Sequence, residues 1–244
     1  MSSQNKEWFA SWFDTPWYHI LYRERDQTEA AAFLDRLIQY LNPDENARFL
    51  DVACGKGRHS IYLNQKGYDV TGIDLSAQNV QKANRNKNEH LRFFKHDMRE
   101  LFSGSFDFVV NLFTSFGYFE NDEDNQLSIQ RMAESTVEGG KVVIDFMNAK
   151  KIIMGLVPDE RKMIDGIEFH IQRELKDGRI VKRISFETNG EKHRYTEYVR
   201  ALTLDDFYVY FQRTGLKILD IFGDYELNDY NAVVSDRLIL IAQK

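Results

Sequence analysis

The sequence of 244 residues has a single cysteine, Cys54, no long apolar run and no excess of positive charge. One cysteine cannot form an intramolecular disulfide, which agrees with a reducing compartment. No run approaches the roughly 20 apolar residues of a membrane-spanning helix, so no membrane partner is expected. The net charge is −6, and nucleic acid would meet a repulsive average field. These properties favour a small-molecule partner over RNA.

The first residues, MSSQNKEWFASWFD, contain no basic region followed by an apolar core and no cleavage signal. A cytoplasmic protein is therefore expected. The sequence also has no internal repeat, low-complexity tract or linker. A chain of this length suits one α/β domain with room for an embellishment.

Up to about residue 148, short apolar runs alternate with segments of helical length. The alternation predicts crossover units and a parallel sheet. Leu34, Leu37 and Leu41 share one face of the first expected helix, and Ser76 is the expected N-cap of a later one. We expect strands at 48–53, 68–73, 91–96, 106–113 and 141–146, and helices at 28–41, 58–65, 76–88 and 124–137.

The pattern changes after Asn148, where apolar and polar residues alternate at period two. Asp177-Gly178 and Asn189-Gly190 separate the alternating runs, and such dipeptides favour tight hairpins because both central positions need positive φ. Three antiparallel strands are therefore expected within an inserted sheet at 160–202. A helix at 204–214 and strands at 216–222 and 237–243 are expected to complete the chain.

The stretch RFLDVACGKGRHSIYLNQKGYDVTGIDLS, residues 48–76, predicts a strand, a glycine turn, a helix and a second strand. A glycine loop before a helix lets backbone amides approach a ligand closely. Ser60 occupies the place of the third glycine of a dinucleotide fingerprint, which argues against NAD. A phosphate loop would end in Gly-Lys-Ser/Thr, and here Arg58 follows Gly57. Another adenosine cofactor remains open.

Five ordered segments carry a family resemblance: LDVACGKGRHS, VTGIDLS, FFKHDMREL, FDFVVNLFTSFGYF and VEGGKVVIDFMN. Together they resemble the successive motifs of class I S-adenosylmethionine-dependent methyltransferases, in particular the sugar and glycine N-methyltransferases. The resemblance implies an α/β, Rossmann-like, seven-stranded and mostly parallel sheet with a three-stranded antiparallel insertion after the fifth strand. Residues 1–244 would form a single methyltransferase domain. S-adenosyl-L-methionine would be the cofactor and S-adenosyl-L-homocysteine the product.

The resemblance also implies which residues bind the cofactor. Asp74 would accept hydrogen bonds from the ribose hydroxyls, and Asp97 and Met98 would reach the adenine. Ala53 is a departure, since the family often has glycine there. The alternatives are that Asp74 and Asp97 only shape turns and that Cys54 is a packing residue. The full expected set is Tyr22, Asp51, Ala53, Cys54, Gly55, Gly57, Asp74, Leu75, Asp97, Met98 and Asn111.

The acceptor pocket is expected around FTSFGYF, residues 113–119, which resembles a segment of the sugar N-methyltransferases. Seven aromatic residues lie between Trp8 and Tyr22. They predict that residues 1–27 form a lid, or alternatively that these side chains cover a hydrophobic edge. The expected pocket residues are Tyr18, Phe113, Ser115, Tyr118, Asn148, Tyr195 and Arg200.

A sulfonium methyl group is already activated, so transfer mainly needs a nucleophile held in line with it. An amine needs little acid-base help, whereas an oxygen nucleophile would need a base such as His59, His170 or His193. We expect no catalytic base and no metal, and an N-acceptor is favoured over an O-acceptor. The alternatives are an RNA or protein methyltransferase and a non-catalytic cofactor-binding module. Both a monomer and a homodimer remain open.

Overall fold

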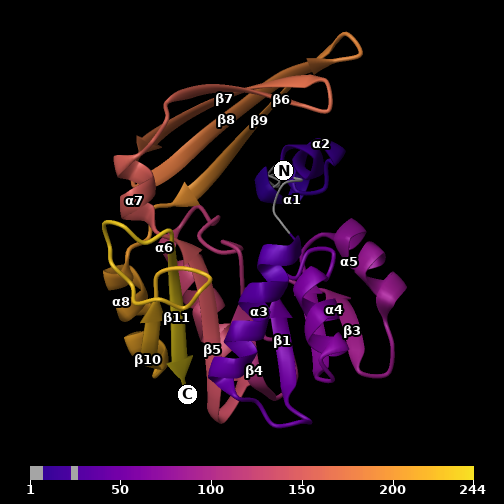
Figure 1. Cartoon of the computed structure of the whole chain (residues 1–244), viewed down its shortest axis with the longest axis vertical. Coiled ribbons are helices and arrows are strands. Elements are labelled where there is room, and N and C mark those ends of the chain that lie inside the picture. Colours follow the sequence, from indigo (N-terminus) through magenta and orange to yellow (C-terminus); the bar gives the residue numbers. More distant parts are fainter. Residues whose placement is uncertain (1–7, 23–26) are drawn as a thin grey trace, which may run out of the picture.

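The computed structural model describes residues 8–22 and 27–244 and contains two β-sheets (Figure 1). The larger sheet has seven strands in the order β10-β11-β5-β4-β1-β2-β3. All pairs among β1 to β5 are parallel, and β11 is antiparallel to both of its neighbours. The predicted mostly parallel, seven-stranded sheet is therefore confirmed. Its strands are β1 (Arg48–Val52), β2 (Asp69–Asp74), β3 (Leu91–Lys95), β4 (Phe106–Asn111), β5 (Thr136–Met147), β10 (Lys217–Phe222) and β11 (Arg237–Gln243).

Helices cover both faces of this sheet, and alternate strand residues face them. Val109 and Val142 belong to the hydrophobic core on the side of α6 and α8, whereas Val110 and Val143 belong to the core on the side of α3 and α4. The helices are α3 (Gln27–Leu41), α4 (Arg58–Gln65), α5 (Ala77–Ala83), α6 (Asp122–Ser135), α7 (Ala149–Met154) and α8 (Leu204–Thr214), with a short 3₁₀ turn η1 (Asn84–Asn86) after α5.

The second sheet is antiparallel and has four strands in the order β6-β7-β8-β9. The predicted number of three strands is wrong, because β6 was not recognised. Three hairpin turns connect the strands, and all six central residues have positive φ, as expected for such turns. The strands are β6 (Asp159–Ile164), β7 (Ile167–Lys176), β8 (Arg179–Thr188) and β9 (Glu191–Arg200).

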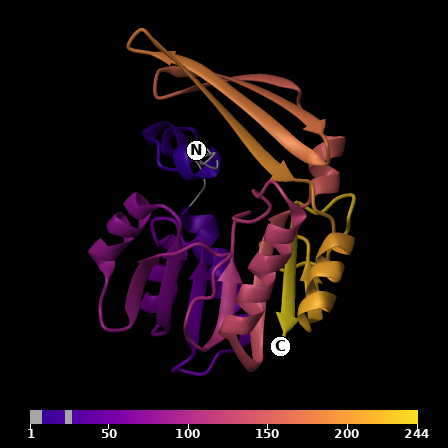
Figure 2. The same cartoon turned by 180° about the vertical axis from the view of Figure 1, so that it is seen from behind.

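Two short helices, α1 (Trp8–Trp12) and α2 (Pro16–Leu21), lie between the four-stranded sheet and the rest of the molecule (Figures 1 and 2). They share a hydrophobic core with that sheet, which includes Trp12, Leu21, Phe169, Ile184 and Phe186. We call residues 8–22 and 159–200 together the roof. The predicted lid and inserted sheet thus pack on one another, although residues 1–7 and 23–26 of the lid lie outside the described residues. Within the described ranges, no helix is both long and apolar enough to span a membrane.

Candidate functional site

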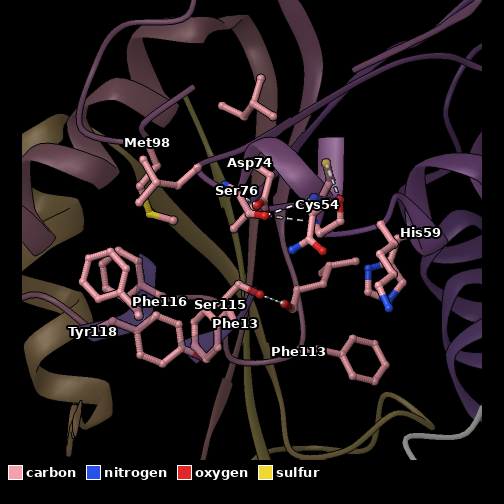
Figure 3. A pocket seen from close by; sticks show the side chains of 18 of the residues that line it. Phe13, Cys54, His59, Asp74, Ser76, Met98, Phe113, Ser115, Phe116 and Tyr118 are labelled. Atoms are coloured by element: carbon pink, nitrogen blue, oxygen red, sulfur yellow. Dashed lines mark hydrogen bonds between the residues drawn. The ribbon is translucent and has the colours of Figure 1, made fainter. Parts of the chain in front are cut away.

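A cavity of about 420 Å³ lies between the roof and the carboxyl ends of the parallel strands. Its floor comes from the segments that follow β1, β2, β3 and β4, and its upper wall comes from α1 and α2. The carboxyl ends of parallel strands are the usual place for ligands in open α/β sheets. Figure 3 shows the side chains of this cavity.

The loop after β1, Ala53–Gly57, forms one side of the floor. Its backbone is held by a hydrogen bond from the Cys54 amide to the Ile73 carbonyl, with an N···O distance of 3.0 Å. Ala53 has φ of 60°, a left-handed conformation that an alanine adopts at a cost of about 1 kcal/mol and a glycine adopts freely. Ala53 therefore adopts a backbone conformation that is also open to glycine. Gly57 must be glycine, because a Cβ there would lie 2.6 Å from the Phe93 ring.

Asp74 stands at the end of β2 and faces this loop (Figure 3). Its two carboxyl oxygens accept hydrogen bonds from the amides of Gly55 and Ser76, both at 2.8 Å. Burial raises the pKa of Asp74, although these amide hydrogen bonds act in the opposite direction. The bonds fix the carboxyl group in one orientation and leave lone pairs for a ligand that carries hydroxyl groups.

Two buried polar atoms that border the same cavity have no hydrogen-bond partner within the described part of the chain. They are Oδ1 of Asn79 and Nε2 of His19. Buried polar atoms are rarely left unpaired in folded proteins, because each unmade hydrogen bond costs free energy.

Asp97 follows β3 and is held by Arg99. Nη2 of Arg99 donates to Oδ2 of Asp97 at 2.6 Å, and Nη1 donates to Asp124 at 3.0 Å. Burial acts to raise the pKa of Asp97, but the hydrogen bonds from Arg99 outweigh it and leave that pKa below its ordinary value. The Arg99 amide also donates to Oδ1 of Asp97, so Asp97 does shape a turn as well as border the cavity. Arg99 was not singled out from the sequence.

The segment after β4 supplies the opposite wall, and its backbone is strained. Phe113 and Thr114 have φ of 57° and 59°, unusual for residues other than glycine. Asp145, fully buried at the end of β5, holds both: its carboxylate accepts from the Phe113 amide at 2.7 Å and its carbonyl accepts from the Thr114 amide at 2.9 Å. Nε of Arg237 donates to the same carboxylate at 2.7 Å.

Two hydroxyl groups on this wall have already donated their hydrogens to the backbone. Ser115 Oγ donates to the Leu112 carbonyl at 2.8 Å, and Tyr118 OH donates to the Thr114 carbonyl. Neither hydroxyl can therefore donate to a ligand, and the Ser115 oxygen can still accept a hydrogen bond. Aromatic rings complete the wall, with ring centroids 5.3 Å apart for Phe13 and Tyr118 and 4.8 Å apart for Phe13 and Tyr18 (Figure 3).

Most of the predicted residues border the cavity, and six do not. Those that border it are Tyr18, Tyr22, Ala53, Cys54, Gly55, Asp74, Leu75, Asp97, Met98, Phe113, Ser115 and Tyr118. Burial raises the pKa of the Cys54 thiol well above its ordinary value, which agrees with a packing role.

Three of the six lie directly behind the floor. Asp51 is 1% exposed and accepts a hydrogen bond from Ser60 Oγ at 2.5 Å. Asn111 is fully buried, and its amide donates to the carbonyls of Val52 and Ser115. Gly57 begins α4. These residues support the loops that border the cavity and do not face it.

The other three, predicted for the acceptor pocket, do not border the cavity and make structural contacts in this structure. The Asn148 amide donates to the carbonyls of Ala232 and Ser235 and so fixes the loop before β11. Tyr195 stacks on Trp12 with ring centroids 4.2 Å apart. Arg200 donates to Asp122 at 3.2 Å.

Three histidines, His19, His59 and His96, border the cavity, and the first two are neutral near pH 7. Burial, with the charge of Arg58, lowers the pKa of His59 to about 3. Because a guanidinium can only donate, Nε2 of His59 accepts from Arg58 at 3.1 Å and its lone pair is used. Burial and then the charge of Lys56 lower the pKa of His19 to about 4. His19, which the sequence did not single out, lies beside the loop after β1.

The histidines of the inserted sheet do not border the cavity. His170 lies 2.8 Å from a carboxyl oxygen of Asp159, and His193 stacks on Phe186 with ring centroids 4.8 Å apart. Both are among the histidines predicted as possible bases for an oxygen nucleophile. Their positions give neither of them a place beside the wall formed by Ser115 and Tyr118.

Comparison with known proteins agrees with this geometry. Residues 49–140 match a family model described as a methyltransferase domain. A dTDP-3-amino-3,4,6-trideoxy-alpha-D-glucopyranose N,N-dimethyltransferase from Streptomyces venezuelae is 30% identical over 52% of this chain and 54% of its own length. A glycine/sarcosine N-methyltransferase from Parasynechococcus marenigrum is 27% identical over 86% of this chain and 76% of its own length. The crystal structure of an S-adenosylmethionine-dependent methyltransferase from Clostridium acetobutylicum superposes with a TM-score of 0.79 at 20% identity, covering 92% of this chain and 94% of that one.

The seven-stranded sheet is Rossmann-like, and its cavity lies at the carboxyl ends of the parallel strands. Residues 49–140 match a methyltransferase domain, and the protein is an S-adenosylmethionine-dependent methyltransferase that resembles those of class I. The cavity fits S-adenosylmethionine, because a ribose would face the fixed Asp74 carboxyl group, which can accept hydrogen bonds from its hydroxyls.

Proposed function

We propose that the protein transfers a methyl group to the nitrogen of a small-molecule amine. The observation that carries the proposal is the state of the two hydroxyl groups on the wall after β4. Ser115 and Tyr118 both donate their hydrogens to carbonyl groups, which leaves the Ser115 oxygen as a hydrogen-bond acceptor on this wall. Lone pairs suit the N–H group of an amine, and the surrounding aromatic faces suit the positive charge that develops on the nitrogen.

An oxygen acceptor would need a base beside this wall, and none of the three histidines that border the cavity belongs to the segment after β4. His96 follows β3, and its Nε2 donates to the Glu100 carbonyl at 3.1 Å. The Nε2 lone pair of His59 accepts a hydrogen bond from Arg58, and His19 lies with Lys56 on the side of the loop after β1. The named activities of the Streptomyces and Parasynechococcus relatives, which are N-methyltransferases, also support nitrogen. The net charge of −6 weighs against an RNA acceptor.

In this proposal the residues of the floor hold the cofactor. Asp74 would accept from the ribose hydroxyls, Asp97 and Met98 would face the adenine, and the loop Ala53–Gly57 would lie under the methionyl part. When bound, S-adenosylmethionine supplies a methyl group that its sulfonium already activates. The protein orients the acceptor through Ser115 and Tyr118 and excludes water with the aromatic wall. We propose the same single unit for residues 1–244, with the roof as its upper half.

Asp74→Ala tests the placement of the cofactor. Loss of a charged acceptor of two hydroxyl hydrogen bonds should weaken S-adenosylhomocysteine binding by about 1 to 3 kcal/mol, measured by isothermal titration calorimetry. Asp69→Ala, at the opposite end of the same strand β2, is the matched control and should bind as the wild type does. Equal affinities of wild type and Asp74→Ala would show that the ribose lies elsewhere.

The acceptor atom is tested with ¹³C-methyl-labelled S-adenosylmethionine and a panel of amines, phenols and a metabolite extract. Carbon-13 NMR separates N-methyl from O-methyl products by their chemical shifts. We expect label on nitrogen only. Label on oxygen would overturn the proposal, and persistent absence of transfer by a protein that binds the cofactor would favour a non-catalytic binding module.

A further inference from the structure

A buried carboxylate in the inserted sheet lies at the centre of the contact between that sheet and the N-terminal helices. Glu197, on β9, is 8% exposed. Its Oε1 accepts a hydrogen bond from Trp12 Nε1 at 2.7 Å, and both of its oxygens lie 2.7 Å from the hydroxyl of Tyr22. One acid thus binds a side chain of α1 and the residue that ends α2.

Lys182, on the neighbouring strand β8, supports the same arrangement. Its Nζ lies 2.5 Å from the Tyr22 hydroxyl, 3.8 Å from Glu197 Oε2 and 4.4 Å from the centre of the Tyr22 ring. The tyrosine is therefore held by hydrogen bonds at its hydroxyl and by a cation at its ring face. Tyr22 also borders the ligand cavity.

Packing alone does not require these charges. The roof has an apolar core of Trp12, Leu21, Phe169, Ile184 and Phe186, and apolar side chains at the two charged positions would close the same contact. Buried ion pairs often add no stability over apolar residues of similar volume. What they add here is direction, because a carboxylate accepts from an indole N–H and a phenol O–H only in defined positions.

We propose that Glu197 is a positioning residue for the cofactor site. It fixes the Tyr22 ring over the cavity, and with it the end of α2 that carries Tyr18 and His19, which also border the cavity. The inserted sheet thereby controls how firmly the upper wall closes on a bound nucleoside, although Glu197 lies 140 residues further along the chain than Gly57 in the loop after β1. The inference rests on the cofactor placement proposed above.

The test measures binding and release of S-adenosylhomocysteine by stopped-flow fluorescence and calorimetry. Glu197→Gln keeps the shape but replaces one acceptor oxygen by a donor amide, so the dissociation rate should rise about tenfold with little change in the association rate. Tyr22→Phe, which removes the hydroxyl, should give a similar rise. The double variant should add little to either, because both changes break the same contact. Glu187→Gln, an exposed position on β8, is the matched control and should dissociate at the wild-type rate.

Lys182→Met/Glu197→Leu separates positioning from stability. It replaces the charged pair by apolar residues and should keep the thermal midpoint near that of the wild type. S-adenosylhomocysteine should nevertheless dissociate from it as fast as from Glu197→Gln. A wild-type dissociation rate in Lys182→Met/Glu197→Leu would overturn the proposal, as would an unchanged rate in Glu197→Gln. If Asp74→Ala weakens binding but Glu197→Gln does not, only this inference fails. If the wild type does not bind S-adenosylhomocysteine, the proposed function fails first.

Discussion

Asp51 carries a carboxyl group that is buried beneath the loop after β1. Among the described residues, no cationic side chain bonds to it. Burial raises its pKa from the ordinary 3.8 to about 7; the hydrogen bond from Ser60 opposes this rise, and the nearby Asp74 carboxyl adds to it. A group whose folded pKa lies above its unfolded pKa favours the native state when protonated. Asp51 therefore makes the free energy of unfolding depend on pH in the neutral range.

Asp51→Asn should remove that dependence. Between pH 4 and 7 the native state keeps a proton that the unfolded chain has released, so this residue's contribution to stability falls as the pH rises and levels off above pH 7. The free energy of unfolding of the variant minus that of the wild type should therefore increase by on the order of 2 to 4 kcal/mol when the pH rises from 4.5 to 8. Urea unfolding at several pH values measures it. Asp44→Asn, at an exposed turn, should follow the wild-type profile, and a parallel profile for Asp51→Asn would contradict the argument.

At this scale the sequence predicted the floor of the cavity well and the supporting contacts poorly. Ala53, Gly55 and Asp74 could be placed because a strand, a turn and a strand end fix their positions locally. The ion pairs that hold the cavity walls were missed for a common reason. Arg99 bonds to Asp124 on α6, and Asp145 bonds to Arg237 on β11. No local pattern states which distant partner a charged residue will meet.

At the scale of elements, the hairpins of the inserted sheet depend on left-handed turn residues. Gly178 has φ of 70°, and a Cβ added there would meet no atom within 4 Å, so a side chain at this position costs only conformational strain. Gly178→Ala should therefore lower the free energy of unfolding by about 1 to 2 kcal/mol. Thermal or urea unfolding checks the value.

Gly155→Ala is the matched control for that substitution. Gly155 ends α7 with φ of −102°, and its added Cβ would lie 3.6 Å from the Lys151 carbonyl, an ordinary contact. Its stability should stay within about 0.5 kcal/mol of the wild type. Equal losses at the two glycines would show that turn conformation is not the cause.

The missed strand β6 has a physical explanation at the same scale. It is an edge strand with the sequence DERKMI, and no residue in it is buried, so it lacks the alternation that identified its neighbours. Charged residues are typical of edge strands, where they discourage pairing with other chains. The signal that could have found it is Asp165-Gly166, a third dipeptide of the kind that identified the other two hairpins.

At the scale of the whole molecule, the roof combines two segments that the sequence treated as separate. Tyr195 stacks on Trp12, and the buried Glu197 binds Trp12 and Tyr22. The family resemblance predicted that both segments lie over the cavity, but the sequence of neither segment predicts that it packs against the other. The structure gives them one hydrophobic core, separate from the two cores of the larger sheet.

A shared core predicts that the two segments of the roof lose protection together. Ile184 is 1% exposed in that core, so Ile184→Ala should remove about 2 to 4 kcal/mol of packing and cavity free energy. Hydrogen exchange followed by mass spectrometry should then accelerate in α1 and α2 as well as in β6 to β9, while β1 and β2 keep their wild-type protection. Val109→Ala, fully buried in β4, should show the reverse pattern, with faster exchange in the larger sheet. Faster exchange in β6 to β9 with α1 and α2 unchanged would mean that the N-terminal helices are held by the cavity wall and not by the inserted sheet. In that case Glu197 could not act on the cofactor site through Tyr22.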